Sequence, residues 1–328
     1  MLLLYCHPNL YFGSPNQNTR TMSQSFETVA ALWKADKRKW VKPSSYSIYV
    51  HLLNKHLLPF FAGKDIITEA DIQGYVTTKL ASGLSLKSIQ DSITILRMIL
   101  SYGEKVGTWP HIPFEVHYPS NTEKRHDIPV LTKQQHKALH NHLQEHFSFR
   151  NLGLLICLHS GLRIGEVCGL QWKDMDVSSG VLHVNKTVQR ISLVDGQERV
   201  NYLSVASPKT DSSLRDIPIS RELMKMIKPL KRFMREDYYL VSNSTKPIEP
   251  RYLRAYFRKV LLELNIPPIR FHALRHSFAT RCIEANCDYK TVSAILGHSS
   301  ISTTLGLYVH PDNRAKRKVI ERVGGMLR

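Results

Sequence analysis

A proline-rich stretch after the first third of the chain limits how the chain can fold. Residues 108–130, TWPHIPFEVHYPSNTEKRHDIPV, contain four prolines and no helical spacing of apolar side chains. Because proline lacks the backbone N–H that a helix interior requires, no regular helix can run through this stretch. The chain of 328 residues is also about the length of two ordinary domains. We therefore predict a domain over 22–107 and another over 131–328, joined by a linker over 108–130.

Helical spacing of apolar residues dominates the first domain. Four helices are predicted, over 25–40, 44–61, 68–82 and 85–107. Ser25 and Thr68 stand where N-caps are expected, and the connections are short and contain Gly or Pro. The first domain should therefore be a small all-α bundle. Residues 1–21 lack this pattern, and we expect them to be a disordered or mis-assigned leader, with Met22 as an alternative start.

The pattern of the second domain changes twice. Thr132 and Gln135 form a capping-box pattern, and the apolar stretch from residue 151 predicts two buried helices broken at Gly161. Alternating β-branched segments then predict three strands, over 180–188, 199–206 and 214–220. Helices resume after them. The expected fold class is mainly α with a small antiparallel β-sheet, an α+β domain preceded by an all-α N-terminal bundle.

The charge of the chain is strongly basic and uneven. It has 45 Lys and Arg against 27 Asp and Glu, a net charge of +18. Residues 128–328 carry 31 basic and 17 acidic side chains, a net of +14, whereas residues 22–110 carry 11 and 7, a net of +4. Such an excess predicts a polyanionic partner, most often nucleic acid. No segment approaches the roughly 18 apolar residues of a membrane span, so we expect no membrane partner.

The cysteines indicate a reducing compartment. There are five, an odd number, and their spacing matches no metal-ligand pattern. Cys157 and Cys168 stand among apolar residues and are predicted to be small core side chains. Free thiols of this kind are typical of the cytosol. We expect a cytoplasmic protein.

Four motifs in the second domain carry polar residues among apolar ones. They are SGLRIGEVCGLQWKDMD (160–176), SPKTDSSLRDIPI (207–219), HALRH (272–276) and LGHSSISTTLGLYVHP (296–311). Taken singly, each has an ordinary structural interpretation. Arg163 can pair with Glu166 on the next turn, and Lys209 can be solvated in its turn. His298 can end a helix, and a tyrosine with apolar neighbours such as Tyr308 usually belongs to a core.

The HALRH segment places two basic residues on one side of a helix. Phe271, Leu274 and Phe278 fall at helical spacing and predict a buried face. His272 and Arg275 are three residues apart and therefore project as neighbours. His276 points elsewhere and is expected to be structural.

Taken together and in this order, the motifs resemble the tyrosine recombinase (phage integrase) family. The resemblance covers residues 132–312, and the preceding bundle is similar to the family's core-binding (SAM-like) DNA-binding domain in size and position. The residues that match the family's catalytic positions are Arg163, Lys209, His272, Arg275, His298 and Tyr308. The resemblance implies a site-specific recombinase that cuts and rejoins double-stranded DNA through a covalent 3′-phosphotyrosine. It also implies a homotetramer working on two DNA sites, in a bacterial cell and associated with the nucleoid.

The chemistry of a phosphodiester explains why these residue types occur together. Two arginines can hold both non-bridging oxygens through forked, charge-assisted hydrogen bonds, each worth about 1.5–3 kcal/mol. These bonds matter most in the transition state, which carries extra charge. Arg163 and Arg275 are the expected clamps, His298 a third donor and Glu166 a residue that orients Arg163.

Tyrosine is a weak nucleophile at neutral pH. Its usual pKa near 10 leaves only about 0.1% as phenolate at pH 7. His272, a histidine with a usual pKa near 6.5, is the expected proton acceptor for Tyr308. Lys209 is the expected donor of a proton to the leaving 5′-oxygen. Because arginine, lysine and histidine supply the positive charge, we expect no metal and no other cofactor.

Rival interpretations remain open at this stage. HLQEH (142–146) matches the inverted zinc-protease motif, but a chain with sixteen histidines gives such matches easily, and we expect a solvated helix face that includes His136 and His140. A DNA-binding regulator without catalysis and a type IB topoisomerase share parts of the pattern. The complete residue set and the LGHSSISTT text favour a recombinase.

The motifs also bear on the biological role of such a recombinase. We expect integration and excision of a phage or other mobile element, with an accessory excision or DNA-bending protein as a further partner. Resolution by an Xer-type recombinase is the alternative, because residues 1–21 are too short for the arm-binding domain of many integrases. The C-terminal NRAKRKVIERVGGMLR is expected to be helical, either docked on a neighbouring subunit or solvated.

Overall fold

The protein is described here from a computed structural model. The described residues are 24–111, 113–120, 129–195, 198–207 and 211–308, with 317, 320–321 and 323–325. The chain divides into two compact units, one of Met1–Asn121 with Leu193–Val200 and one of Thr122–Ser192 with Asn201–Arg328. The expected leader, 1–21, lies outside the described residues, as does most of the expected C-terminal helix. No helix in the described part of the chain is long and apolar enough to span a membrane.

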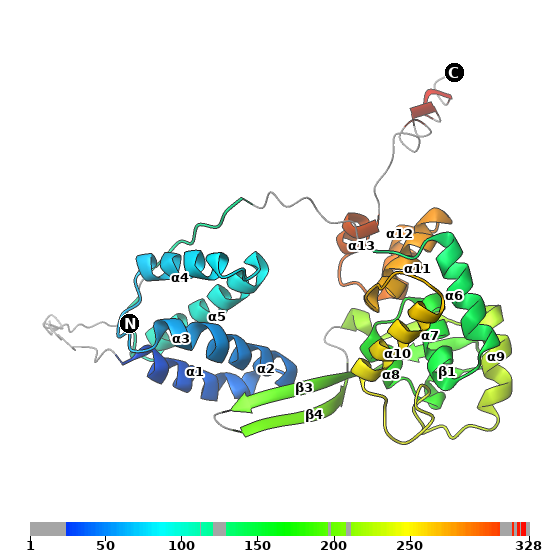
Figure 1. The fold of residues 1–328 in the computed structure, drawn as a ribbon, viewed down its shortest axis with the longest axis horizontal. Coiled ribbons are helices and arrows are strands. Elements are labelled where there is room, and N and C mark those ends of the chain that lie inside the picture. The colour runs from blue at the N-terminus through cyan, green and yellow to red at the C-terminus, as the bar shows by residue number, and fades with distance from the viewer. Residues whose placement is uncertain are drawn as a thin grey trace, which may run out of the picture. The chain divides into compact units, whose positions relative to one another are not determined.

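The first unit is the predicted all-α bundle (Figure 1). Its helices are α1 (Phe26–Trp40), α2 (Pro43–Leu52), α3 (Leu58–Phe61), α4 (Glu69–Ala81) and α5 (Leu86–Lys105). One apolar cluster fills it, and Phe26, Trp33, Tyr75 and Leu96 are among its fully buried members. The amphipathic spacing read from the sequence is therefore the spacing that the core uses.

The helix predicted over 44–61 is interrupted by a π-helical turn, Leu53–Leu57. In this turn the backbone N–H of Leu58 donates to the carbonyl of Leu53, five residues earlier. The next residue is Pro59, which has no N–H to donate, so the regular hydrogen-bond ladder cannot continue through it. The shift in register lets the chain pass the proline while it stays helical.

The two predicted caps of the first unit differ. Thr68 forms a capping box with Asp71, as expected: the Asp71 N–H donates to Thr68 Oγ1 over 3.2 Å and the Thr68 N–H to Asp71 Oδ2 over 2.9 Å. Ser25 stands at the N-cap of α1, but its side chain makes no capping bond to the backbone. Its hydroxyl instead lies 3.1 Å from that of Thr28. The predicted N-cap position at Ser25 is therefore confirmed, although its side chain does not bond the backbone.

The described part of the proline-rich stretch packs against the bundle. Trp109 is buried in the same apolar cluster as α1 and α5. The backbone of His117 exchanges two hydrogen bonds with the Gln73 side chain of α4, over 3.0 and 3.1 Å. The N–H of Glu115 donates to the Glu69 carboxylate over 3.3 Å. Up to Ser120, where this described segment ends, the irregular chain therefore belongs to the first unit.

The second unit is mainly helical with two small sheets. Its helices are α6 (Lys133–Glu145), α7 (Phe149–Ser160), α8 (Ile164–Gly169), α9 (Arg221–Lys231), α10 (Pro250–Glu263), α11 (His272–Glu284), α12 (Tyr289–Leu296) and α13 (Ile301–Tyr308). Its strands are β1 (Met175–Asp176), β2 (Val181–Val184), β3 (Thr187–Asp195), β4 (Glu198–Ala206) and β5 (Arg215–Pro218). Strands β1, β2 and β5 form an antiparallel sheet in that order, while β3 and β4 pair separately.

The strand predicted over 180–188 is two strands that belong to different sheets. The break falls at Asn185 and Lys186, whose side chains both donate to the buried carboxylate of Asp174, over 3.0 and 2.6 Å. These two side chains bond Asp174 at the point where β2 ends, and the next strand, β3, pairs with β4. Alternation of side chains alone does not reveal such a change of sheet.

Helix α7 is the centre of the second unit. Residues 152–158 are all buried, because this helix is apolar on every side. It packs against α6, α8, α9, α10 and α11. It ends at Gly161, where the sequence predicts a break, and the positive φ of 65° at this residue is a left-handed cap that favours glycine. A side chain there would also meet Phe278 and Leu296 at 2.7 Å, so the helix end sits directly against α11 and α12.

Candidate active site

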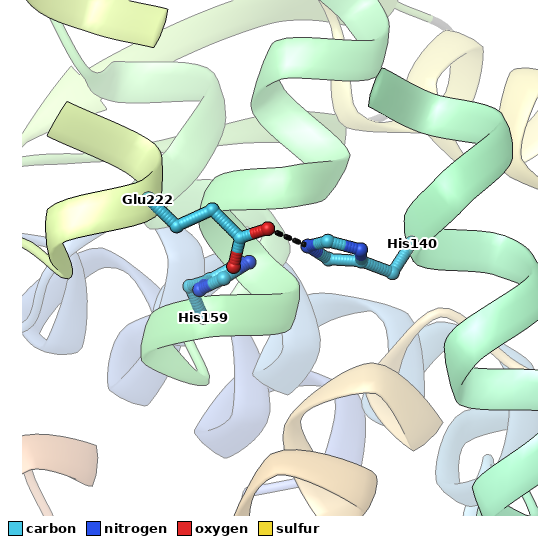
Figure 2. A group of neighbouring side chains, drawn as sticks. All are labelled: His140, His159 and Glu222. Carbon is cyan, nitrogen blue, oxygen red and sulfur yellow. Dashed lines mark ion pairs between the residues drawn. The ribbon is translucent and has the colours of Figure 1, made fainter. Parts of the chain in front are cut away.

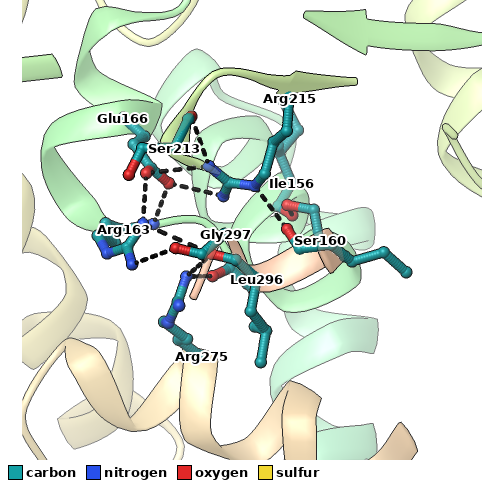
Figure 3. A network of polar contacts seen from close by, with 11 residues as sticks. Ile156, Ser160, Arg163, Glu166, Ser213, Arg215, Arg275, Leu296 and Gly297 are labelled. Carbon is teal, nitrogen blue, oxygen red and sulfur yellow. Dashed lines mark hydrogen bonds and ion pairs between the residues drawn. The ribbon is translucent and has the colours of Figure 1, made fainter. Parts of the chain in front are cut away.

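A buried carboxylate organises two arginines from distant parts of the sequence. Glu166, on α8, lies between Arg163 and Arg215 (Figure 3). Arg163 Nη1 donates to Glu166 Oε1 over 2.9 Å, and the Arg163 N–H donates to Oε2 over 2.9 Å. Arg215 donates to both oxygens, over 3.1 and 2.9 Å. Burial would raise the pKa of Glu166, but the hydrogen bonds and charges of the two arginines hold it below its usual value.

Two successive carbonyls at the end of α12 hold the arginines from the other side. Arg163 Nη2 donates to the Gly297 carbonyl over 2.9 Å, and Arg275 Nη1 donates to that of Leu296 over 2.7 Å. Arg275 Nη1 also donates to the Gly161 carbonyl, over 3.0 Å. Arg275 is 1% exposed, whereas the side chain of Arg163 is 36% exposed. The Arg163 side chain therefore stays partly open to solvent, whereas Arg275 is enclosed.

Glycine is required at the turn that carries these carbonyls. Gly297 has a φ of 68°, in the left-handed region. A side chain there would lie 2.9 Å from the Ser212 carbonyl oxygen and 3.0 Å from Arg215 Nη1. The motif LGH thus combines a positive φ with close packing against the β5 region, which brings the next residue, His298, into the site.

His298 is held by one hydrogen bond and surrounded by positive charge. Its Nδ1 lies 2.8 Å from the buried hydroxyl of Thr304 on α13. Burial and the charges of Arg275, Arg163, His272 and Arg215 lower the pKa of His298 to about 4. Arg163 and Arg275 bond the two carbonyls that directly precede His298 in the chain, so the structure brings these motif residues together beside the ring.

We expect the imidazole of His298 to stay neutral far below its usual pKa of 6.5. Because the unfolded chain takes up this proton first, the ring's contribution to stability should fall as the pH drops from about 6.5 to about 4. NMR titration of the ring, assigned by its absence in His298→Gln, should give a midpoint near 4. Arg163→Gln should raise that midpoint, because it removes one of the charges. A wild-type midpoint near 6.5 would contradict this arrangement.

His272 begins α11 and remains accessible. Partial burial and the charges of Arg275 and Arg163 lower its pKa, so at pH 7 the ring is neutral and can accept a proton. His276 packs edge-to-face against it, with ring centroids 4.6 Å apart. The prediction that His276 points elsewhere is therefore wrong: one turn along the helix, its ring supports that of His272.

Two of the predicted residues cannot be placed by their side chains. Tyr308 is the last residue of α13, which packs on α11 and α12, and its side chain is outside the described residues. Lys209 follows β4 and lies outside them altogether. The structure therefore brings together Arg163, Glu166, His272, Arg275 and His298, and it places only the helix that carries Tyr308.

Arg215 is the residue that the sequence analysis missed. Its side chain is 6% exposed, and its Nε donates to the Ile295 carbonyl over 2.6 Å while its Nη atoms hold Glu166. A signal was present in the strand LRDIPI. Arg215 and Ile217 are two positions apart in β5 and therefore project from the same side of the strand. Because Ile217 is buried, the charged Arg215 stands at a core-facing position. Such a residue needs a buried partner.

The histidines of α6 do not form a solvated face. The side chains of His140 and His142 are less than one-fifth exposed, and they lie 3.4 and 3.7 Å from Glu222 and Glu263. His142 and His146 of HLQEH stack on each other with centroids 4.5 Å apart. The expectation of a solvated face is wrong because α6 packs against α7 and keeps these rings near neighbouring helices.

Comparison with family models identifies the family of the chain. Residues 129–314 match the model of the phage integrase family, and residues 25–80 match that of the phage integrase N-terminal SAM-like domain. The first match alone spans more than half of the chain. The chain belongs to the phage integrase family. It is thus a tyrosine recombinase, a site-specific DNA recombinase, as its motifs predicted.

Relatives of this integrase-family chain include both Xer-type and mobile-element proteins. It is 27% identical over 282 residues to a XerC-like tyrosine recombinase of Caldanaerobacter subterraneus, which covers 80% of this chain and 72% of that protein. It is 26% identical over 329 aligned positions to the ICEBs1 integrase of Bacillus subtilis, which covers 94% and 85%.

Solved structures of other integrases share the fold. The Tn1549 transposon integrase in complex with a circular intermediate DNA superposes with a TM-score of 0.71 at 22% identity, covering 92% of this chain and all of that one. A lambda integrase tetramer bound to a Holliday junction gives a TM-score of 0.60 at 16% identity, with coverage of 89% and 84%. The predicted fold class is confirmed.

Proposed function

We propose that this recombinase cleaves one DNA strand with the hydroxyl of Tyr308 and stores the bond as a 3′-phosphotyrosine. A 5′-hydroxyl from another strand then attacks the phosphotyrosine and reseals the DNA in a new arrangement. The observation that carries the proposal is that Arg163 and Arg275 both bond the carbonyls that end α12, directly before His298, while His272 stands one turn before Arg275 on α11. Membership of the integrase family and the place of Tyr308 on the adjoining helix support it.

The arginines serve as the phosphate clamp. Arg163, fixed by Glu166 and Gly297, offers the more accessible side chain, and Arg275 adds its charge from a buried position. The loss of solvent around Arg275 strengthens its field on a phosphate above it. When the Thr304 hydroxyl donates to Nδ1 of His298, the proton of the neutral ring lies on Nε2, and this N–H can donate to the phosphate. When the negative charge of a bound phosphate favours the protonated ring, both ring nitrogens carry a proton, and Nε2 again donates. Positive charge for the transition state thus comes from side chains, and no metal cofactor is proposed for the reaction.

Proton transfer is assigned to two residues. His272, neutral at pH 7 and accessible, takes the proton of Tyr308 as it attacks. Lys209 gives a proton to the 5′-oxygen as that oxygen leaves. The phosphotyrosine then preserves the energy of the phosphodiester, so resealing requires no nucleotide triphosphate.

The partners follow from this chemistry and from the family. Double-stranded DNA is the substrate, and the net charge of +18 predicts binding that weakens steeply with salt. Two DNA sites must be cut together, and we propose a homotetramer, the assembly in which lambda integrase is seen on a Holliday junction. An accessory excision or DNA-bending protein is a further proposed partner. The site of action is the bacterial nucleoid in the cytoplasm.

The proposed role is integration and excision of a mobile element. Its support is the similarity over 94% of this chain to the ICEBs1 integrase and the fold shared with a transposon integrase. Resolution of the Xer type is the second candidate, favoured by the XerC-like relative. Recombination of plasmids carrying either the gene's own flanking junctions or a chromosomal dimer-resolution site separates the two roles.

A covalent trap tests the chemistry directly. The full chain is incubated in EDTA with labelled duplexes that span the gene's flanking junctions, and the products are separated under denaturing conditions. A labelled protein band that a protease removes supports a protein–DNA bond. Salt-sensitive binding in native gels with no such band, on a library of targets as well as on the junctions, would contradict the proposed strand transfer.

Lys209→Ala should slow cleavage of ordinary DNA by about 10²-fold or more, because the 5′-oxygen then leaves without a proton. A substrate with sulfur in place of the bridging 5′-oxygen has a leaving group that needs no proton, and on it the variant should approach the wild-type rate. Rates of covalent-complex formation on the two substrates provide the measurement. Equal losses on both substrates would remove Lys209 from the role of general acid.

A further inference from the structure

Three metal-ligating side chains from three helices meet outside the site of Figure 3. His140 comes from α6, His159 from α7 and Glu222 from α9, and Figure 2 shows the carboxylate facing both rings. Each residue offers a ligand atom, and these atoms all lie within 4.8 Å of one another. No other group of this kind occurs in the described part of the chain. Neither the clamp nor the proton transfers use these residues.

The geometry is close to that of a tetrahedral zinc site. Zinc bonds of about 2.1 Å to imidazole nitrogen and carboxylate oxygen place neighbouring ligand atoms about 3.4 Å apart. His140 Nε2 and Glu222 Oε1 are 3.4 Å apart. The Glu222 side chain is 53% exposed, so it can rotate to shorten the longer separations and leave room for a water ligand. Two imidazoles, one carboxylate and a water are a common zinc ligand set.

The surrounding hydrogen bonds orient the ligands for this task. His159 Nδ1 lies 3.1 Å from Ser220 Oγ, which already accepts the N–H of Leu223 at the start of α9. The serine oxygen can accept from Nδ1–H as well, which leaves the lone pair of His159 on Nε2. Gln144 donates to Glu222 Oε1 over 2.9 Å. Histidine and carboxylate ligands of metals are typically supported by such outer bonds.

We propose that His140, His159 and Glu222 bind one divalent transition-metal ion, zinc by the chemistry of its ligands. The ion would tie α6 to the end of α7 and the start of α9. Those two elements flank the site: α7 ends just before Arg163, and α9 begins just after β5, which carries Arg215. The bound ion therefore stabilises the frame of the second unit and takes no part in strand transfer, so this inference does not depend on the proposed function.

Zinc binding is tested on the full chain without an affinity tag. The protein is treated with EDTA, freed of it and titrated with ZnCl₂ in a calorimeter. We expect one ion per chain and a higher unfolding temperature with zinc. CoCl₂ should produce the visible absorption of a four-coordinate site. A wild-type chain that neither binds zinc nor gains thermal stability from it would overturn the proposal.

Variants locate the ion. Glu222→Gln changes an exposed side chain and should fold normally, yet it should weaken zinc binding by about tenfold or more. His159→Asn should do the same. His142→Asn is the matched control. His142 lies on α6, as the proposed ligand His140 does, but it pairs with Glu263 and stacks on His146. Binding that survives Glu222→Gln and His159→Asn, or is lost in His142→Asn, would place the ion elsewhere and contradict the assignment.

Discussion

Tyr308→Phe should abolish the covalent protein–DNA product and leave DNA affinity unchanged. The substitution removes one hydroxyl at the end of α13 and no charge, so phosphate contacts, which carry most of the affinity, remain. Loss of a covalent nucleophile typically lowers the rate by more than about 10³-fold. The measurement is the labelled band on a denaturing gel, alongside the binding curve of the same preparation in native gels.

Tyr289→Phe is the matched control for this experiment. Tyr289 is an exposed tyrosine at the start of α12, in the same unit. Its variant should form the covalent product at the wild-type rate. A labelled band from Tyr308→Phe would mean that another residue attacks the phosphate, and a band lost equally in both variants would point to a general defect.

Arg215→Met should destabilise the second unit by about 3 kcal/mol. Glu166 and Arg215 are 3% and 6% exposed, and removing one partner of a buried pair leaves the other charge uncompensated. The effect should lie at the lower end of the usual 3–5 kcal/mol, because Arg163 still bonds the carboxylate. Urea unfolding of wild type and variant provides the free energies. Recombination should fall as well, because Glu166, which positions Arg163, loses one of its two arginine partners.

The pH dependence distinguishes a lost charge pair from lost packing. In the wild type the pKa of Glu166 lies below its usual 4.5, so the stability that the ionised form contributes is present above that pH and is lost as the pH falls through the lower value. In Arg215→Met burial dominates and raises this pKa. Glu166 then takes up a proton on acidification, and the difference in stability between the two proteins should shrink toward pH 4.

An exposed ion pair serves as the control for Arg215→Met. Arg235 holds Asp237 over 3.0 Å, with both side chains more than half exposed. Arg235→Met should therefore leave the free energy of unfolding nearly unchanged, since solvated pairs contribute little. A deficit of Arg215→Met that is no larger than this, or that stays constant with pH, would show that Glu166 does not depend on Arg215.

Several features followed from the sequence because they depend on neighbours in the chain. The capping boxes of Thr68 and Thr132 join residues three apart, and both are formed. Gly161 ends a helix that is apolar on every side, at the position where the sequence predicts a break. The pairing of Arg163 with Glu166 is also local, one turn apart, and it is present. The order of motifs likewise identified the family before any coordinates were considered.

Only the tertiary structure decided the contacts between elements that are distant in sequence. Arg215 reaches Glu166 across 49 positions, and the pattern of a strand does not show which buried carboxylate a core-facing arginine contacts. His140, His159 and Glu222 come together from three different helices, whereas HLQEH, a zinc-protease motif by its letters, places His142 and His146 in a stacked pair of rings. Local hydrogen bonds and periodicity are written in short segments of sequence. The partner of a buried charge is chosen by packing, which depends on the whole fold.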